Sequence, residues 1–163
     1  MGQARWRRRA LPAQAAAELQ YAAAMKTLSD LAGTKWSGQA ELWLDDLGNQ
    51  AELCDCTIEL AHGALTYHWS YQGTPHTGQL TLRDGGADFT DTWHSPKAMG
   101  CTTVPGSWAL VEVAGTYPAG DGPPWGWRIA LSLRPSGELL LLMTNIAAWG
   151  EEGRAVRMIC KPS

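Results

Sequence analysis

Residues 65–73 read LTYHWSYQG, so large apolar or aromatic side chains alternate with small or polar ones until a glycine ends the run. Alternate residues of a β-strand point to opposite faces, and this alternation therefore predicts a strand with one buried face and one exposed face. A turn is expected at Gln72 and Gly73. The side chains expected to point inward are Leu65, Tyr67, Trp69 and Tyr71.

Similar short segments recur along the chain. From Lys35 onward, turn-forming residues separate about nine strand candidates, and no helical pattern is long enough to connect parallel strands. We therefore predict an all-β fold, either a sandwich or, by preference, an antiparallel up-and-down barrel of about 8–10 strands with an N-terminal helix. Further interior positions are expected at Phe89, Trp93, Trp127, Met143 and Asn145.

The first 24 residues differ in composition from the rest. They hold four arginines against one glutamate, for a formal charge of +3, and are rich in alanine. Since the whole chain carries −3, residues 25–163 carry −6. Good helix formers follow Pro12 and predict a helix within residues 10–31. We interpret residues 1–24 as a basic extension, partly helical or disordered, and residues 25–163 as the barrel.

Composition and charge argue against several classes of function. An acidic body would repel phosphate backbones, so nucleic-acid binding is not expected. The sequence has no apolar run of about 18 residues, so no membrane span is expected. Polar residues interrupt any apolar signal segment, and the expected location is cytoplasmic. The cysteines at positions 54, 56, 101 and 160 are expected to be reduced, buried thiols without a metal.

One predicted interior position carries a carboxylate. Asp91 shares its face with Phe89 and Trp93 in a strand expected over residues 88–94. Burial would raise the pKa of Asp91 and make it a general acid or base, with His94 near it at the rim but on the other face. The alternative is a structural carboxylate, bonded to the backbone or paired with an arginine. The arginines considered for that pairing are Arg128 and Arg157.

Two segments carry a resemblance to a known family. Residues 31–38 place Trp36 shortly after a glycine where the first strand is expected, and residues 154–159 place arginine on the last strand. This arrangement resembles the calycin (lipocalin-like) superfamily, in which the tryptophan plugs one barrel end and the arginine packs across it. The resemblance implies these roles for Trp36 and Arg157, with Arg154 as the alternative for the arginine.

The wider sequence is similar to a group of bacterial proteins of unknown function with calycin-like barrels. The similarity is carried by residues 85–94 and 125–128 and extends over residues 28–161. Calycins include carriers, haem proteins and some enzymes, so the resemblance implies a fold without a single activity.

A barrel lined by aromatic rings can enclose a small ligand. The first hypothesis is therefore that the chain binds a small hydrophobic or aromatic molecule. The second is an enzyme in which Asp91 and His94 perform general acid–base chemistry on a small organic substrate. Haem binding through one histidine, and a contact role such as a homodimer, are further alternatives, and no cofactor is assigned. The residues expected to line the cavity are Tyr67, Trp69, Tyr71, Phe89, Asp91, Trp93, Trp127, Met143 and Asn145.

Overall fold

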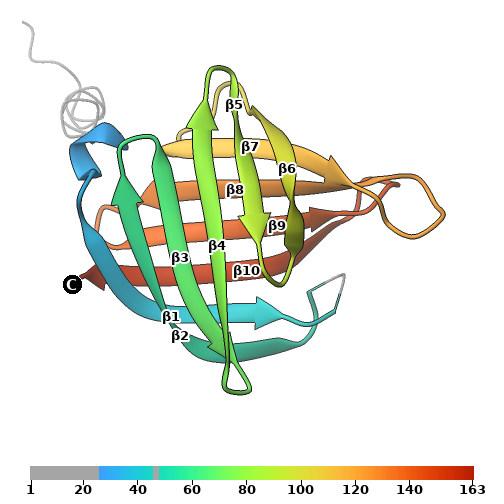
Figure 1. Cartoon of the computed structure of the whole chain (residues 1–163), viewed down its shortest axis with the longest axis horizontal. Helices are drawn as coiled ribbons and strands as arrows, with labels where there is room; N and C mark the ends of the chain where they lie inside the picture. The colour runs from blue at the N-terminus through green and yellow to red at the C-terminus, as the bar shows by residue number, and fades with distance from the viewer. Residues whose placement is uncertain (1–25, 46–47) are drawn as a thin grey trace, which may run out of the picture.

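The computed structural model describes residues 26–45 and 48–163, which form one closed antiparallel β-barrel. Each strand pairs with its neighbours in sequence, and β1 pairs with β10 to close the sheet (Figure 1). The prediction of an all-β, antiparallel, up-and-down barrel is confirmed. The strands are β1 (Lys35–Trp43), β2 (Ala51–Ala61), β3 (Ala64–Tyr71), β4 (Thr74–Arg83), β5 (Gly86–Asp91), β6 (Ser95–Thr103), β7 (Val111–Tyr117), β8 (Trp125–Leu133), β9 (Leu139–Ile146) and β10 (Glu152–Pro162).

The N-terminal helix is not confirmed. In the part of the chain that the structure describes, the only helical element is the single 3-10 turn η1 (Ser29–Leu31). Residues 26–28 of the predicted helix form no helix, and its residues 10–25 lie outside the described residues. Helix propensity is a weak preference, so the helix-forming residues before Leu31 are not enough to predict a helix there. Among the described residues, no helix is long and apolar enough to cross a membrane.

The meander gives the barrel two chemically different ends. The first, which we call the Trp36 end, holds η1, the start of β1 and the connections β2–β3, β4–β5, β6–β7 and β8–β9. The second, the His94 end, holds the connections β3–β4, β5–β6, β7–β8 and β9–β10. In Figure 1, η1 lies at the left and the β7–β8 loop at the right, while β3 to β5 cross steeply in front of β7 to β10. The two ends therefore take different loops and different side chains.

Trp36 is buried at its end of the barrel, and its indole N–H donates to Thr34 Oγ1 at 2.8 Å. Leu28 and Leu31 of the η1 segment are buried in the same core. Arg157 is not part of this plug. It is half-exposed and forms an ion pair with Glu41, its partner across β1 and β10, at 2.6 Å.

The assignment of Arg157 to closing the barrel is therefore wrong. Cross-strand partners share a face, and the Glu41–Arg157 pair lies outside, opposite to the inward positions of β1. A bulge between Arg154 and Val156 sets the register of β10 here. Arg154 also lies away from Trp36, with its guanidinium 5.7 Å from the ring centroid of Trp43.

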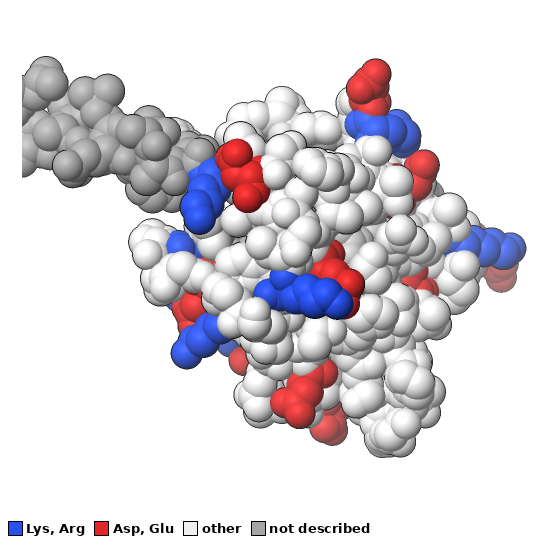
Figure 2. Space-filling view, turned by 60° about the vertical axis from the view of Figure 1, so that its left-hand side comes forward, with Lys and Arg blue, Asp and Glu red and all other residues white. Residues whose placement is uncertain are grey.

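The outer surface carries charges in matched pairs. Figure 2 shows that most basic side chains on the face in view lie beside acidic ones, with uncharged surface between the pairs. The ion pairs outside the candidate site are Lys35–Glu59, Arg83–Asp88, Arg128–Glu112, Arg128–Glu152, Arg134–Glu138 and Arg157–Glu41. Neither arginine considered as a partner of Asp91 pairs with it.

The barrel interior is one continuous core. Its largest fully buried side chains include Tyr67 and Phe89, both from the predicted inward set. A Cβ on Gly78 would lie 2.0 Å from Cζ of Tyr67, so this glycine leaves the space that the Tyr67 ring occupies. Large side chains from both walls therefore fill the middle of the barrel, and the polar and titratable groups collect towards the His94 end.

Candidate ligand site at the His94 end

Asp91, the last residue of β5, ties two strands and a turn together. Its Oδ1 accepts hydrogen bonds from the backbone N–H groups of Trp93 at 2.7 Å and His94 at 2.8 Å. Its Oδ2 accepts the hydroxyl of Tyr67, which comes from β3. The carboxylate is buried, and both of its oxygens have donors. Asp91 therefore has the structural role considered above, in which its carboxylate accepts hydrogen bonds from the backbone and, here, from a tyrosine.

The turn after Asp91 corrects two expectations about side-chain direction. The strand predicted over residues 88–94 ends at Asp91, where the register with β6 shifts, and the alternation of faces ends with it. Trp93 is therefore 45 % exposed and does not lie in the interior. The side chain of His94 is only 13 % exposed and lies among inward rings, so its predicted outward position is wrong. Its Nδ1 is 3.3 Å from Oδ1 of Asp91.

The pKa of Asp91 shifts opposite to the expected direction. Burial raises it, but the nearby His94 side chain, the Tyr67 hydroxyl and the His94 backbone N–H together outweigh burial, and the net pKa lies below the ordinary value. The pKa of Tyr67 is raised well above its ordinary value by burial, by the charge of Asp91 and by their hydrogen bond. Near neutral pH the pair is therefore a charged acceptor with a neutral donor.

Aromatic rings surround this pair, and we call Trp69, Tyr71, His76, Trp93, His94 and Trp127 the ring cluster. His76 stacks on Trp69 with ring centroids 4.4 Å apart. The ring of His94 lies 6.1 Å from that of Trp69 and 5.1 Å from that of Trp127. Trp93 packs edge-on against Trp69 at 5.7 Å. Rings from the three strands β3, β4 and β8 and from the β5–β6 turn thus meet at one end of the barrel.

The ring cluster also holds most of the unpartnered polar atoms. Among the described residues, the buried side-chain nitrogens and oxygens without a hydrogen bond are Trp69 Nε1, Trp127 Nε1, His76 Nε2, His94 Nδ1 and Glu41 Oε2. Two of these have charged neighbours, since Glu41 Oε2 lies 2.6 Å from Arg157 and His94 Nδ1 lies 3.3 Å from Asp91. The other three all belong to the ring cluster. A buried donor without an acceptor costs about 1–3 kcal/mol.

Other tryptophans of the described chain show the contrast. The indole N–H of Trp36 donates to Thr34, and that of Trp149 donates to Glu151 at 3.0 Å. Trp69 and Trp127 are only 4 % and 5 % exposed, yet their indole N–H groups have no acceptor. These two donors are therefore the features of this end that a bound molecule would satisfy.

The remaining predicted residues lie deeper or to one side. Phe89 stacks near Trp127 at 6.4 Å, and the sulfur of Met143 lies 3.9 Å from the hydroxyl of Tyr67. Asn145 is buried, and its Oδ1 accepts the hydroxyl of Tyr117 at 2.5 Å. Phe89 and Met143 are therefore core side chains beneath the ring cluster.

Two members of this end were not predicted, His76 and Tyr117. His76 lies in β4 on the same face as Gly78 and Leu80. Tyr117 ends β7 on the face of Val113, and its ring meets Trp127 edge-on at 6.3 Å. In both strands, counting back or forward by two from a buried apolar residue would have given the inward face.

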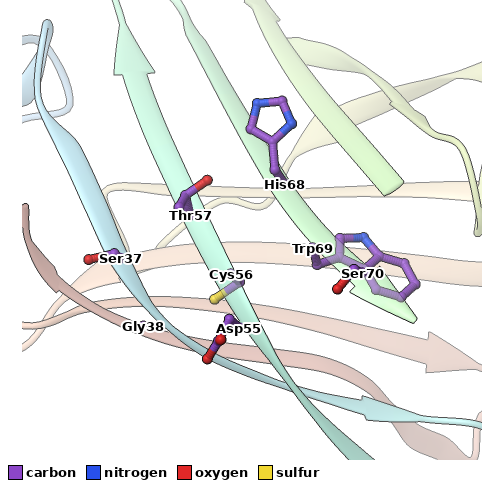
Figure 3. Close-up of a pocket in the computed structure, with 8 residues that line it drawn as sticks. All are labelled: Ser37, Gly38, Asp55, Cys56, Thr57, His68, Trp69 and Ser70. Carbon is purple, nitrogen blue, oxygen red and sulfur yellow. The ribbon is translucent and has the colours of Figure 1, made fainter. Parts of the chain in front are cut away.

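A hollow lies on the outer wall, between β1, β2 and β3 (Figure 3). It has a volume of about 510 Å³. Its side chains are mostly small and polar, and His68 at its border is held by a 3.0 Å contact of Nδ1 with Thr77 Oγ1. The residues that line it are Ser37, Gly38, Asp55, Cys56, Thr57, His68, Trp69 and Ser70. No group of three or more potential metal ligands occurs in the described part of the chain.

The chain matches no protein-family model and no curated protein. Its function is therefore inferred from the chemistry of the described residues.

Proposed function

We propose that this protein binds a small hydrophobic or aromatic molecule at the His94 end, and that the molecule carries a hydrogen-bond acceptor. The observation that supports this most strongly is the pair of buried, unpartnered indole N–H groups of Trp69 and Trp127, with the His94 ring between their rings. Flat rings favour a flat partner, and unsatisfied donors favour a carboxylate or carbonyl. The calycin-like assignment rests on sequence resemblance, and the cytoplasmic location rests on the interrupted apolar segment and the expected reduced thiols; both are part of the same proposal.

Tryptophan fluorescence titration with naphthoate and naphthalene tests the proposal. Naphthoate is expected to quench saturably because it offers both a flat ring and an acceptor, while naphthalene offers only the ring. Trp69→Phe keeps an aromatic ring but removes the donor, and is expected to weaken naphthoate binding about tenfold. Trp108→Phe is the matched control, because Trp108 is 82 % exposed and lies in the β6–β7 connection at the other end.

The outcomes of the titration distinguish a ring cluster that binds a ligand from one that only fills the barrel. Saturable naphthoate binding that weakens in Trp69→Phe and not in Trp108→Phe supports the proposal. A folded protein that binds neither probe overturns it, and the rings would then serve only to fill the barrel. Hemin belongs in the same titration, since a Soret band lost in His94→Gln would replace this ligand class with haem.

The second candidate function is acid–base catalysis, and the observation that favours it is the contact between Asp91 and His94. A carboxylate beside Nδ1 fixes the orientation of an imidazole and makes it a competent base. The oxygens of Asp91 are occupied, so His94 would be the catalytic residue and Asp91 its positioning residue. Hydrolysis of aryl esters by wild type but not by His94→Gln, with naphthoate binding retained, would support catalysis; equal rates would exclude it.

A further inference from the structure

Gly38 of β1 lies between two cysteines from the strands on either side. It pairs with Cys56 of β2 and with Cys160 of β10. Cross-strand partners project to the same face, and a glycine has no side chain to separate its two neighbours. The two thiols therefore meet over Gly38, with their sulfurs 3.6 Å apart and both residues buried.

The close approach depends on this glycine. A Cβ at position 38 would lie 1.9 Å from the carbonyl oxygen of Ile159 and 2.8 Å from Cα of Cys160. Any other residue would push β10 away from β1 and separate the sulfurs. Gly38 thus allows β1 to pair closely with β10, the pairing that closes the barrel and that we call the β1–β10 seam. It also allows the two thiols to meet across β1.

The strands β1 and β2 form the wall beneath the outer hollow, and the two thiols lie on the inward face of the barrel wall, in the core. Gly38 and Cys56 both line that hollow, and Figure 3 shows the sulfur of Cys56 directed towards Gly38. The hollow opens between β1, β2 and β3, so small reagents come close to the strand segment that carries Cys56.

The two thiols also differ in acidity. The pKa of Cys160 is lowered because the thiol of Cys56 donates a hydrogen bond to it, although burial opposes this. The pKa of Cys56 is raised by that same hydrogen bond and by burial. The thiolate is the attacking form of cysteine, and the hydrogen bond between the two sulfurs stabilises it on one of them.

We propose that Cys56 and Cys160 form a reversible disulfide across Gly38 when the protein meets hydrogen peroxide. Both S–H bonds break and one S–S bond forms, and the two electrons and two protons reduce the peroxide to two waters, breaking its O–O bond. The sulfurs need to approach by about 1.5 Å to reach bonding distance. A thiol reductant restores the pair. The bridge joins β2 to β10 and reinforces the seam between the first and last strands.

Thiol counting with peptide mapping tests this directly. After peroxide treatment, unfolding and alkylation, two of the four thiols are expected to be protected, and the linked peptides are expected to contain Cys56 and Cys160. Cys160→Ser is expected to leave no protected thiol. Cys101→Ser is the matched control, since Cys101 is also buried but its nearest hydrogen-bond partner is the carbonyl of Met99, and it should keep the bridge.

The wild-type map alone decides the matter if a variant does not fold. A linked Cys56–Cys160 peptide that disappears on reduction, together with a higher melting temperature of the oxidised protein, supports the site. Four alkylated thiols after oxidation, or linkage through Cys54 or Cys101, overturns it.

Discussion

At the scale of single residues, Asp91 and Tyr67 have a structural role at the His94 end. Asp91 holds the β5–β6 turn through two backbone N–H groups and receives the hydroxyl of Tyr67 from β3. The sequence predicted that Asp91 and Tyr67 share the interior. It did not predict their contact, because that depends on the register of β3, β4 and β5, which alternation within one strand does not fix.

Tyr67→Phe is expected to destabilise the fold by about 1–3 kcal/mol, because it leaves a buried carboxylate oxygen without its donor. Urea unfolding followed by fluorescence measures the change. Tyr71→Phe is the control, since the Tyr71 hydroxyl meets only the exposed Gln72 amide, at 3.1 Å. Equal stabilities of wild type and Tyr67→Phe would contradict the role given to this hydrogen bond.

Asp91 also predicts an acid dependence of stability. Its folded pKa is depressed below the ordinary value of 3.8, so its ionised form stabilises the fold above that pH and the contribution is lost as pH falls through the folded pKa. The stability difference between wild type and Asp91→Asn should not decrease from about pH 7 to 5 and should shrink below about pH 4. Unfolding at a pH series measures it. A difference that already shrinks between pH 7 and 5 would indicate a raised pKa.

At the scale of elements, the strand alternation was predictable and its interruptions were not. The inward faces of β3, β8 and β9 follow from counting by two. The count fails after Asp91, where a turn begins, and this misplaced both Trp93 and His94. For β10, the buried residues Met158 and Cys160 would have placed Arg157 outside, but the family resemblance was given more weight.

Gly38 makes the clearest prediction about an element, because a Cβ there would overlap the backbone of β10. Gly38→Ala is expected to cost about 1–3 kcal/mol through overpacking against Ile159, and to abolish the Cys56–Cys160 bridge. Gly100→Ala is the control, since a Cβ there would meet only the Arg83 guanidinium at 3.6 Å. Thermal unfolding and thiol counting report the two effects. Wild-type stability in Gly38→Ala would show that the seam adjusts freely.

For the whole molecule, the two barrel ends differ in whether their buried indole N–H groups have an acceptor. The Trp36 end is apolar and its indole N–H is satisfied by Thr34, while the His94 end gathers rings with unsatisfied nitrogens. Such donors cost free energy in the empty protein, and a ligand that accepts from them would return it. The composition predicted a barrel rich in tryptophan. Only the strand order shows which tryptophans share an end.

The closure of the Trp36 end predicts how much of the N-terminal region the barrel needs. The first described side chains buried in the core are Leu28 and Leu31, both after residue 24. Deletion of residues 1–24 is therefore expected to leave the free energy of unfolding unchanged within about 0.5 kcal/mol. Deletion of residues 1–33 removes both leucines and uncovers Trp36, and should cost about 3–5 kcal/mol.

Urea unfolding of the two truncated proteins beside the full chain measures both values. The shorter deletion is the control for the longer one, because both remove the four arginines and differ only by the segment that carries η1. If the two deletions destabilise equally, residues 1–24 stabilise the barrel themselves, and its boundary lies before Met25. If neither deletion lowers the free energy of unfolding, Trp36 closes this end without the η1 segment. The pairing of β1 with β10 then provides the stability attributed to η1.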